Sequence, residues 1–392
     1  MAARVVIAGG GSGATILANA LDHRRFEVTM VSASLEHLFQ PALLYIAFKG
    51  APVNPVRDQR KLLAKKVALL HDRVTRVDLP RQRVETASGE NLDYDYLVLA
   101  TGMGTDPAQI PGLAEISARF GDYHSTVAQA RKLWQSLQAF GGGTIVLGQS
   151  SPICKCPPSP IEGILLADEL LRARHLRQRS RLVFFTPYPR PYPAAPINEL
   201  VEPILADRGI EVMRFFDVDR IDAASSTIHS IEGDEVHFDL PIIVPPFVGA
   251  DIAYEPPDVV DPDRFVITDQ RTLRVKGMDN VFAIGDGANL PTSKAGVGAH
   301  LEAGVVARTL QGRPASFNGR TNCPFDLAGG RGTFVIGSYD APVVKLRPSR
   351  LHHAMKMLFG RIYWLSLRGW LEPAFRLYFG ITAPPSRRAG AP

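Results

Sequence analysis

The chain has 392 residues, enough for two or three domains, and 45% of them are hydrophobic while 21% are charged. This balance excludes a disordered or collagen-like chain, and 3 cysteines are too few for a disulfide-stapled fold. The formal net charge is +5, but residues 347–392 alone carry +7, which leaves −2 for the rest of the chain. Basic character therefore belongs to the C-terminal segment.

The first seven residues already have the pattern of a strand, and no charged region followed by an apolar stretch opens the chain. We therefore expect no signal peptide and a location on the cytosolic side of a membrane. No uninterrupted apolar run approaches the roughly 20 residues that span a bilayer, so we also expect no transmembrane helix.

A glycine-rich turn lies between a buried parallel strand at residues 5–8 and a helix at residues 15–21. The turn reads G-x-G-x-x-A, and its three small positions are occupied by Gly9, Gly11 and Ala14. The first glycine permits a tight turn, the second lets the backbone approach a pyrophosphate, and the alanine lets the helix pack closely on the strand. With a second strand at residues 27–31, this unit predicts a dinucleotide site at the helix N-terminus.

The carboxylate that commonly binds the ribose at the end of the second strand is missing, because Ser32 stands there. The Ser32 hydroxyl can hydrogen-bond a ribose hydroxyl, though more weakly than a carboxylate would. We keep Ser32 as the candidate ribose ligand, with a plain polar strand end as the alternative.

Two further strands end in short motifs, which are formed by Ala100, Thr101 and Gly102 and by Gly285 and Asp286. With the glycine turn, these segments resemble the two-dinucleotide-binding-domain flavoproteins, in which the Gly-Asp carboxylate binds the ribityl chain of FAD. The resemblance implies FAD, which we expect to be non-covalent because no cysteine is placed for a link. It also implies Val74 at the adenine and Lys294 at the flavin pyrimidine, where an ammonium and a helix N-terminus would stabilise negative charge.

The same resemblance implies an α/β fold with two Rossmann-like three-layer domains that hold the flavin at their interface. We place the FAD-binding domain at residues 1–105 and 265–345 and the second Rossmann-like domain at residues 106–264. Residues 346–392 are expected to form a C-terminal amphipathic helical segment that binds a membrane and quinone.

In most members of this superfamily the second domain repeats the glycine motif and binds a nicotinamide cofactor. Here the matching strand at residues 144–148 runs into a loop, residues 149–160, in which prolines and cysteines replace the glycines. Such a loop cannot bring a helix N-terminus to a pyrophosphate, so we expect no NADH or NADPH donor.

Residues 156–162, Cys-Pro-Pro-Ser-Pro-Ile-Glu, resemble the C-x-x-P-x-x-E stretch of sulfide:quinone oxidoreductases and of the flavoprotein of flavocytochrome c sulfide dehydrogenase. Residues 318–324 resemble the segment that carries the partner cysteine. The resemblance implies a redox pair in which Cys156 carries sulfur and Cys323 passes electrons to the flavin; two unrelated buried cysteines are the alternative. A cysteine at a helix N-terminus tends to have a lowered pKa, and we expect this of Cys156.

Other residues near this pair carry weaker signals. Glu162 is a candidate proton acceptor, and its alternative role is to complement the positive end of the helix. Cys154 is expected to be a bystander. Ser125 and Gln129 stand where several bacterial members carry a third cysteine and a histidine, which leaves the length of the sulfur chain open.

The C-terminal segment has the pattern of a basic amphipathic helix. Its apolar residues recur at three- and four-residue spacing and are Leu351, Met355, Leu358, Ile362, Trp364 and Leu365. Its charge comes from His352, His353, Lys356, Arg361 and Arg368, and aromatic residues such as Tyr378 and Phe379 follow. We expect this helix to lie in the headgroup layer of a membrane, with Phe359 and Tyr363 as quinone contacts; a helix packed on the core is the alternative. The sulfur and FAD sites are expected earlier in the chain, so deletion of residues 351–392 should leave reduction of the flavin by sulfide intact.

The resemblance thus implies a sulfide:quinone oxidoreductase, which oxidises sulfide to sulfane sulfur or polysulfide and passes electrons through FAD to ubiquinone or menaquinone. We expect a peripheral protein of the inner or cytoplasmic membrane, with no metal and no nucleic-acid partner, and leave a homo-oligomer open. A type II NADH:quinone oxidoreductase is disfavoured by the missing second glycine motif. A soluble flavocytochrome c-type sulfide dehydrogenase is disfavoured by the membrane-like tail, and a catalytically dead flavin scaffold by the retained cysteine pair.

Overall fold

The structure is a computed structural model that describes residues 2–313 and 315–375. Tyr378 and Phe379, named above as aromatic residues of the C-terminal segment, lie outside the described residues. Within the described ranges, no helix is both long and apolar enough to cross a membrane.

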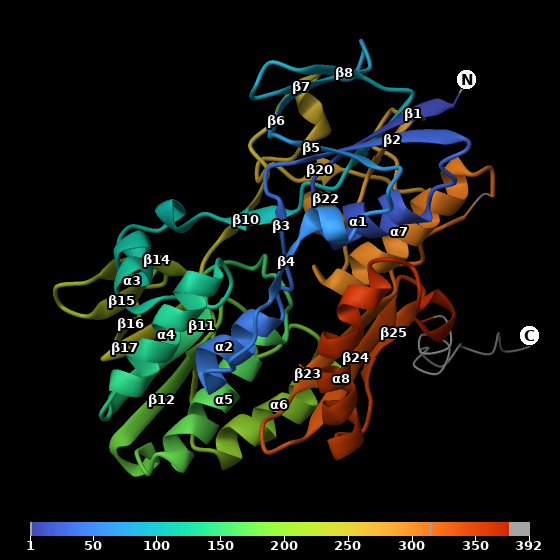
Figure 1. Cartoon of the computed structure of the whole chain (residues 1–392). Helices are drawn as coiled ribbons and strands as arrows, with labels where there is room; N and C mark the ends of the chain where they lie inside the picture. The colour runs from blue at the N-terminus through green and yellow to red at the C-terminus, as the bar shows by residue number, and fades with distance from the viewer. Residues whose placement is uncertain (1, 314, 376–392) are drawn as a thin grey trace, which may run out of the picture.

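One half of the molecule is built on a five-stranded parallel sheet in the order β21, β9, β1, β2, β5. These strands are β1 (Ala3–Ala8), β2 (Phe26–Ser32), β5 (Ala68–His71), β9 (Tyr96–Leu99) and β21 (Val281–Ala283). Helices α1 (Ser12–Ala20) and α7 (Gly296–Leu310) pack together on one face, and a second sheet covers the other (Figure 1). That covering sheet consists of β19 (Ala253–Glu255), β6 (Val74–Asp78), β7 (Arg83–Thr86) and β8 (Asn91–Asp93).

The other half has a four-stranded parallel sheet of β13 (Glu211–Met213), β12 (Ser180–Phe185), β11 (Gly143–Gln149) and β17 (Leu240–Val244). Successive side chains of β11 enter different cores, because neighbouring strand residues point to opposite faces. Ile145 and Leu147 pack with α2 (Ala42–Lys49), α4 (Val127–Ala139) and α5 (Ser159–Ala173). Val146 packs instead with α3 (Leu113–Phe120) and the sheet of β14 (Val218–Asp222), β15 (Thr227–Ser230) and β16 (Glu235–His237).

Short strand pairs support the connections around these two sheets. The pair that joins the two halves is β10 (Met103–Thr105) with β18 (Phe247–Gly249), which run antiparallel between them (Figure 1). The remaining pairs are β3 (Glu36–Leu38) with β4 (Val56–Asp58) and β20 (Val266–Ile267) with β22 (Ala288–Asn289).

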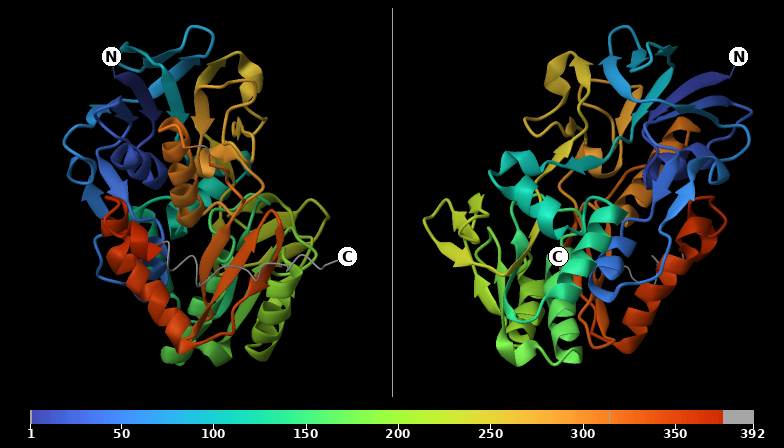
Figure 2. Two further views of the ribbon diagram at one scale, coloured as in Figure 1. Left: turned by 90° about the vertical axis from the view of Figure 1, so that its right-hand side faces the viewer. Right: turned by 60° about the vertical axis from the view of Figure 1, so that its left-hand side comes forward.

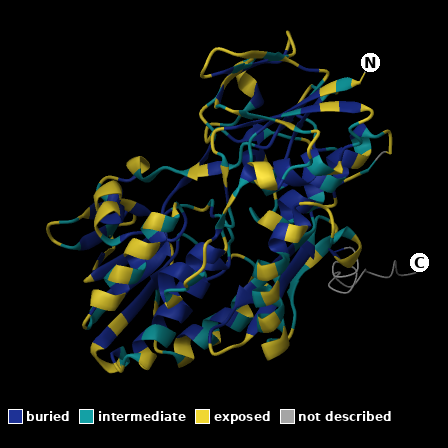
Figure 3. Cartoon of the chain, in the orientation of Figure 1, coloured by how far each residue is buried: buried dark blue, intermediate teal, exposed yellow. Residues whose placement is uncertain are grey.

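The C-terminal part adds an antiparallel meander of β23 (Thr321–Asp326), β24 (Gly332–Ser338) and β25 (Ala341–Lys345). Helix α8 (Arg350–Ser366) packs on β23 and β24, and α6 (Ala195–Asp207) lies along β25 on the other side (Figure 2). Strand β23 contacts both α5 and α7, so it lies between the two halves. Buried residues fill both parallel sheets (Figure 3). The predicted α/β fold with two Rossmann-like units is therefore confirmed.

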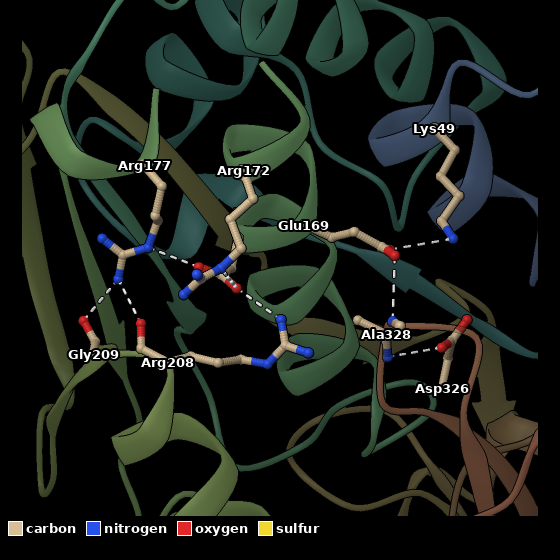
Figure 4. Close-up of polar contacts among 10 residues, drawn as sticks. Lys49, Glu169, Arg172, Arg177, Arg208, Gly209, Asp326 and Ala328 are labelled. Atoms are coloured by element: carbon tan, nitrogen blue, oxygen red, sulfur yellow. Dashed lines mark hydrogen bonds and ion pairs between the residues drawn. The ribbon is translucent and has the colours of Figure 1, made fainter. Parts of the chain in front are cut away.

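A buried carboxylate ties the second sheet to its helices. Asp168 of α5 is fully buried and binds three arginines, at 2.7 Å for Arg177, 2.7 Å for Arg208 and 2.9 Å for Arg172. Arg177 also donates to the carbonyls of Arg208 and Gly209 ahead of β13 (Figure 4). Burial alone would raise the pKa of Asp168, but the arginine hydrogen bonds outweigh it and hold the pKa below its usual range.

We expect Asp168→Asn to lower the free energy of unfolding by about 2–4 kcal/mol, because three arginines would lose their common anion. Urea denaturation at neutral pH measures this change. Glu211→Gln is the matched control, since Glu211 pairs with Arg181 at 2.7 Å but is 49% exposed, and such a pair contributes less than about 1 kcal/mol. Equal losses in the two variants would contradict a structural role for the buried carboxylate.

Candidate active site

The glycine turn connects β1 to α1 in the shape that a dinucleotide needs. Gly9 has φ +119°, and a Cβ there would lie 2.1 Å from the carbonyl oxygen of Ala100, so only glycine fits. At Gly11 a Cβ would meet no atom within 4 Å, which leaves open space in front of the turn. No side chain caps α1, so the first amides of the helix are free to bind an anion. Ala14 is fully buried against the core.

The motifs at the ends of β9 and β21 lie against each other. A Cβ at Gly287 would be 2.9 Å from the carbonyl oxygen of Gly102, which leads on from Thr101 at the end of β9. On the other side, the amide of Gly285 donates to the Glu302 carboxylate of α7 at 2.6 Å. Burial raises the pKa of Glu302 to about 7. Sequence reasoning missed Glu302, because a glutamate inside a helix carries no signal of a partner in a distant turn.

Ser32 and Val74 lie close together at the edge of this site. The amide of Asp72, two residues before Val74, donates to the Ser32 carbonyl at 3.0 Å. The Ser32 hydroxyl donates to the Ser34 carbonyl at 2.7 Å, as a polar strand end does. Contacts of Ser32 and Val74 with a nucleotide stay predictions.

The two cysteines lie on either side of one short segment. The backbone amide of Cys156 donates to the Lys294 carbonyl at 2.9 Å, and Cys323 Sγ lies 3.2 Å from the hydroxyl oxygen of Ser293. Cys323 is 3% exposed, and all three cysteines are free thiols. Cys156 has φ +58°, which is a strained conformation for a residue with a side chain and costs about 1–2 kcal/mol. The structure thus brings the predicted pair together, although 167 residues separate them in the sequence.

The expectation of a lowered pKa for Cys156 is wrong. Burial raises the pKa of this thiol well above its usual value, and the charges of Glu162 and Cys323 add to the effect. Burial also raises the pKa of Cys323 to about 11, against hydrogen bonding from Ser293.

Glu162 pairs with Lys356, a residue that the sequence analysis assigned to a membrane surface. Its Oε1 accepts the Asp326 amide at 2.5 Å and contacts the ammonium of Lys356 from α8, and the Glu162 side chain is only 2% exposed. Burial raises the pKa of Glu162, against the lowering effect of Lys356. The expectation that Lys356 supplies charge to a membrane surface is therefore wrong, because its side chain is 10% exposed and faces the cysteine site.

A second glutamate of α5 contacts the hairpin formed by β23 and β24, the strand pair to which Asp326 belongs. Glu169 lies seven residues after Glu162, accepts the Gly329 amide at 3.3 Å and pairs with Lys49 of α2 at 3.5 Å (Figure 4). Helix α5, which follows the Cys156 loop, is thus fixed at two points to the hairpin that carries Cys323. These contacts set the relative position of the two cysteines.

A pocket of about 260 Å³ lies next to this site, between the two halves. Cys154 and Tyr188 line it from the second half, and Phe265, Asn289 and Lys294 line it from the first. The Lys294 ammonium donates to the Ala288 carbonyl and lies 5.2 Å above the Phe265 ring, and burial lowers its pKa. Asp286 lies 3.7 Å from the ammonium of Lys155, the residue that stands between Cys154 and Cys156 in the sequence. Burial raises the pKa of Cys154 to about 12.

The quinone candidates lie on α8 above the glycine turn. Tyr363 is 7% exposed, and its hydroxyl faces inward, while its ring packs 4.5 Å from that of Phe39. Phe359 is half-buried, with its ring centroid 6.2 Å from that of Tyr363. Both remain predictions as quinone contacts.

The two nucleotide-type sheets define a dinucleotide-binding oxidoreductase, and free thiols lie between them. The chain belongs to the pyridine nucleotide-disulphide oxidoreductase family, whose model matches residues 3–307. The mitochondrial sulfide:quinone oxidoreductase of Mus musculus is 26% identical over 95% of this chain and 88% of that protein. The X-ray structure of sulfide:quinone oxidoreductase from Aquifex aeolicus aligns with a TM-score of 0.85 at 21% identity, over 98% of this chain and all of that one. NDH2 from Plasmodium falciparum in complex with NADH aligns with a TM-score of 0.71 at 14% identity, over 95% and 98% of the two chains.

FAD is the cofactor of this chain, and the residues present fit it. The uncapped N-terminus of α1 faces open space at Gly11, as a pyrophosphate requires. Gly102 and Gly285 hold positive φ angles of 68° and 72°, and these two turns bring the Asp286 carboxylate to the carboxyl ends of the strands. Ser293 and Lys294, which contact the two cysteines, follow Asp286 of the Gly-Asp turn by seven and eight residues.

We expect Glu162→Gln to lower the pKa of the Cys156 and Cys323 thiols, because the negative charge of Glu162 raises both while Lys356 lowers them. Iodoacetamide labelling of the reduced protein, followed at each cysteine by mass spectrometry, should then rise at lower pH than in the unmodified chain. Glu169→Gln is the matched control on the same helix. An unchanged pH profile in Glu162→Gln would rule out this coupling.

Proposed function

We propose that this chain is a sulfide:quinone oxidoreductase. The observation that carries the proposal is the placement of Cys156 and Cys323 on either side of residues 293–294, at the edge of the FAD site. Relatives that match nearly the whole chain carry this name. A loop with prolines in place of the second glycine motif disfavours a nicotinamide donor.

The proposed thiol chemistry begins from the oxidised cysteine pair. Hydrosulfide attacks a Cys156–Cys323 disulfide, so that one S–S bond breaks and another forms, giving a persulfide on Cys156 and a thiolate on Cys323. Closure of a trisulfide between the persulfide and the thiolate then releases one proton and two electrons. Bound FAD would supply the acceptor for these two electrons and, once reduced, the donor to quinone, which takes up two protons to become quinol.

Residues around the pair have roles that follow from their contacts. The Ser293 hydroxyl lies 3.2 Å from Cys323 Sγ and would donate a hydrogen bond to the thiolate that leaves the disulfide. Glu162, in a buried site with a raised pKa, would accept the proton that the persulfide releases, and Lys356 would hold its carboxylate in place.

Sulfide should bleach the flavin absorbance within the mixing time of an anaerobic experiment, whereas NADH should not. Cys156→Ala and Cys323→Ala should each slow this reduction by a factor of about 1,000 or more, since neither can form the disulfide that sulfide attacks. Cys154→Ala is the control and should keep most of the activity. Fast reduction by NADH would favour a type II NADH:quinone oxidoreductase instead.

We further propose that α8 attaches the protein to a membrane, with its outer face inserted. Three leucines seven residues apart are exposed, by 67% for Leu351, 53% for Leu358 and 40% for Leu365. Trp370 beyond the helix is 66% exposed. An exposed apolar row flanked by Arg361 and Arg368 suits the headgroup layer of a bilayer. Quinone would then reach Phe359 and Tyr363 from the lipid, at an inner or cytoplasmic membrane.

The expectation that residues 351–392 can be deleted without effect on the sulfide reaction stays a prediction, and two contacts of α8 argue against it. Lys356 of α8 pairs with Glu162 beside the cysteines, and Tyr363 of α8 hydrogen-bonds Ser12 of the glycine turn at 2.6 Å. Deletion would remove the ammonium that pairs with the Glu162 carboxylate at the sulfur site. Point substitutions on the outer face are therefore the sharper test.

We expect the triple variant Leu351→Glu, Leu358→Glu, Leu365→Glu to lose liposome binding by a factor of 100 or more, because each buried leucine is worth about 1.5 kcal/mol or more. Quinone reduction in membranes should fall with it, while reduction of the flavin by sulfide should persist. The control triple variant changes exposed apolar residues elsewhere, Val53, Phe215 and Ile231, to Glu. Unchanged cosedimentation of the α8 variant with liposomes would contradict the membrane role.

A further inference from the structure

A buried chain of hydrogen bonds connects α8 to the glycine turn. The Tyr363 hydroxyl lies 2.6 Å from Ser12 Oγ and 2.7 Å from His37 Nε2. On its other side, His37 Nδ1 lies 3.1 Å from the Gly10 carbonyl and 2.9 Å from the Gln59 side-chain oxygen. These contacts join the last turns of the chain's final described helix to its first helix, 351 residues earlier.

The acceptors fix the direction of each bond. His37 Nδ1 faces two carbonyl-type oxygens, so it carries the ring proton, and burial lowers the pKa of His37, which keeps the ring neutral. Nε2 is then an acceptor, and the Tyr363 hydroxyl donates to it. The Ser12 hydroxyl in turn donates to the Tyr363 oxygen.

A second path of hydrogen bonds leads from Gln59 back to the glycine turn. Gln59 donates its amide to the Thr15 hydroxyl at 2.8 Å, and that hydroxyl donates to the Gly11 carbonyl at 2.9 Å. The carbonyls of Gly10 and Gly11 are therefore both held by protein donors. With these carbonyls turned to the protein, the uncapped amides at the start of α1 face the open space at Gly11.

We propose that Tyr363 is a positioning residue for FAD, which acts through Ser12 and His37 to hold the glycine turn in its binding conformation and couples FAD binding to the docking of α8. By thermodynamic linkage, FAD must then stabilise docked α8 by the same factor that docked α8 strengthens FAD binding. The inference rests on FAD as the cofactor, and it is independent of sulfide and quinone as substrates.

Tyr363→Phe keeps the ring and its packing and removes only the hydroxyl. We expect FAD to leave this variant about two- to tenfold faster than the unmodified holoprotein, because the hydrogen bonds of the hydroxyl to Ser12 and His37 are both lost. The rate is read from the rise of free-flavin fluorescence after dilution. Tyr94→Phe is the matched control, because Tyr94 is fully buried in the same half and its hydroxyl has no hydrogen-bond partner among the described residues.

Amide hydrogen exchange separates coupling from a general loss of stability. In the unmodified chain and in Tyr94→Phe, adding FAD to the flavin-free protein should slow exchange in α8. In Tyr363→Phe this slowing by FAD should shrink, by the factor by which FAD release accelerates. Equal FAD-dependent protection of α8 in all three proteins, or unchanged FAD release in Tyr363→Phe, would overturn the proposal. Both measurements need no sulfide, so their outcome is separate from that of the sulfide reaction.

Discussion

The buried carboxylate of Glu162 is the group that dictates how the C-terminal part must lie. An ionised carboxylate without water costs several kcal/mol, so its charge has to be balanced within the protein. The backbone amide of Asp326 and the ammonium of Lys356 supply that balance, one from β23 and one from α8. The Cys323 strand and the last described helix are therefore both placed by one side chain that lies six residues after Cys156.

This constraint explains why α8 is polar on its inner side. His353, Lys356 and Tyr363 share one face, and each meets a polar group of the body, namely Asp326, Glu162 and Ser12. The leucines at 351, 358 and 365 are left on the opposite face. An ordinary surface helix has its apolar stripe inside. Here the inner face also supplies the ammonium of Lys356 to the buried carboxylate of Glu162, while the three leucines lie on the exposed outer face.

Local patterns predicted the parts of the site that are local in sequence. Three segments could be predicted from the sequence, because the backbone geometry they require limits the residue types. They are the glycine turn after β1, the Gly-Asp turn after β21 and the Cys156 loop. The orientation of α8 could not be predicted, since a helix with two unlike faces shows the same periodicity whichever face is inside. Lys356 was therefore assigned to lipid. His353, Lys356, Gly360 and Tyr363 are spaced so that they share one face of the helix. This spacing alone does not show that the face is the inner one, which becomes clear only from the position of Glu162.

The pKa of the Cys156 thiol was mispredicted for a related reason. Proximity to a helix N-terminus is visible in sequence, whereas the density of protein around a sulfur atom and the charge of Glu162 are properties of the folded chain. Glu302 and its hydrogen bond to Gly285 were missed likewise. Contacts made across 17 to 351 residues carry no local pattern from which to infer them.

The leucine row on α8 has the seven-residue period of a coiled-coil seam. In water without lipid or detergent, a second copy that laid its own α8 across this row would shield it from solvent, and such a contact would be self-complementary. Under the proposed membrane role, lipid and self-association would compete for the same surface. Protein concentration, detergent and lipid content consequently belong among the variables that determine whether a purified sample contains single molecules or pairs.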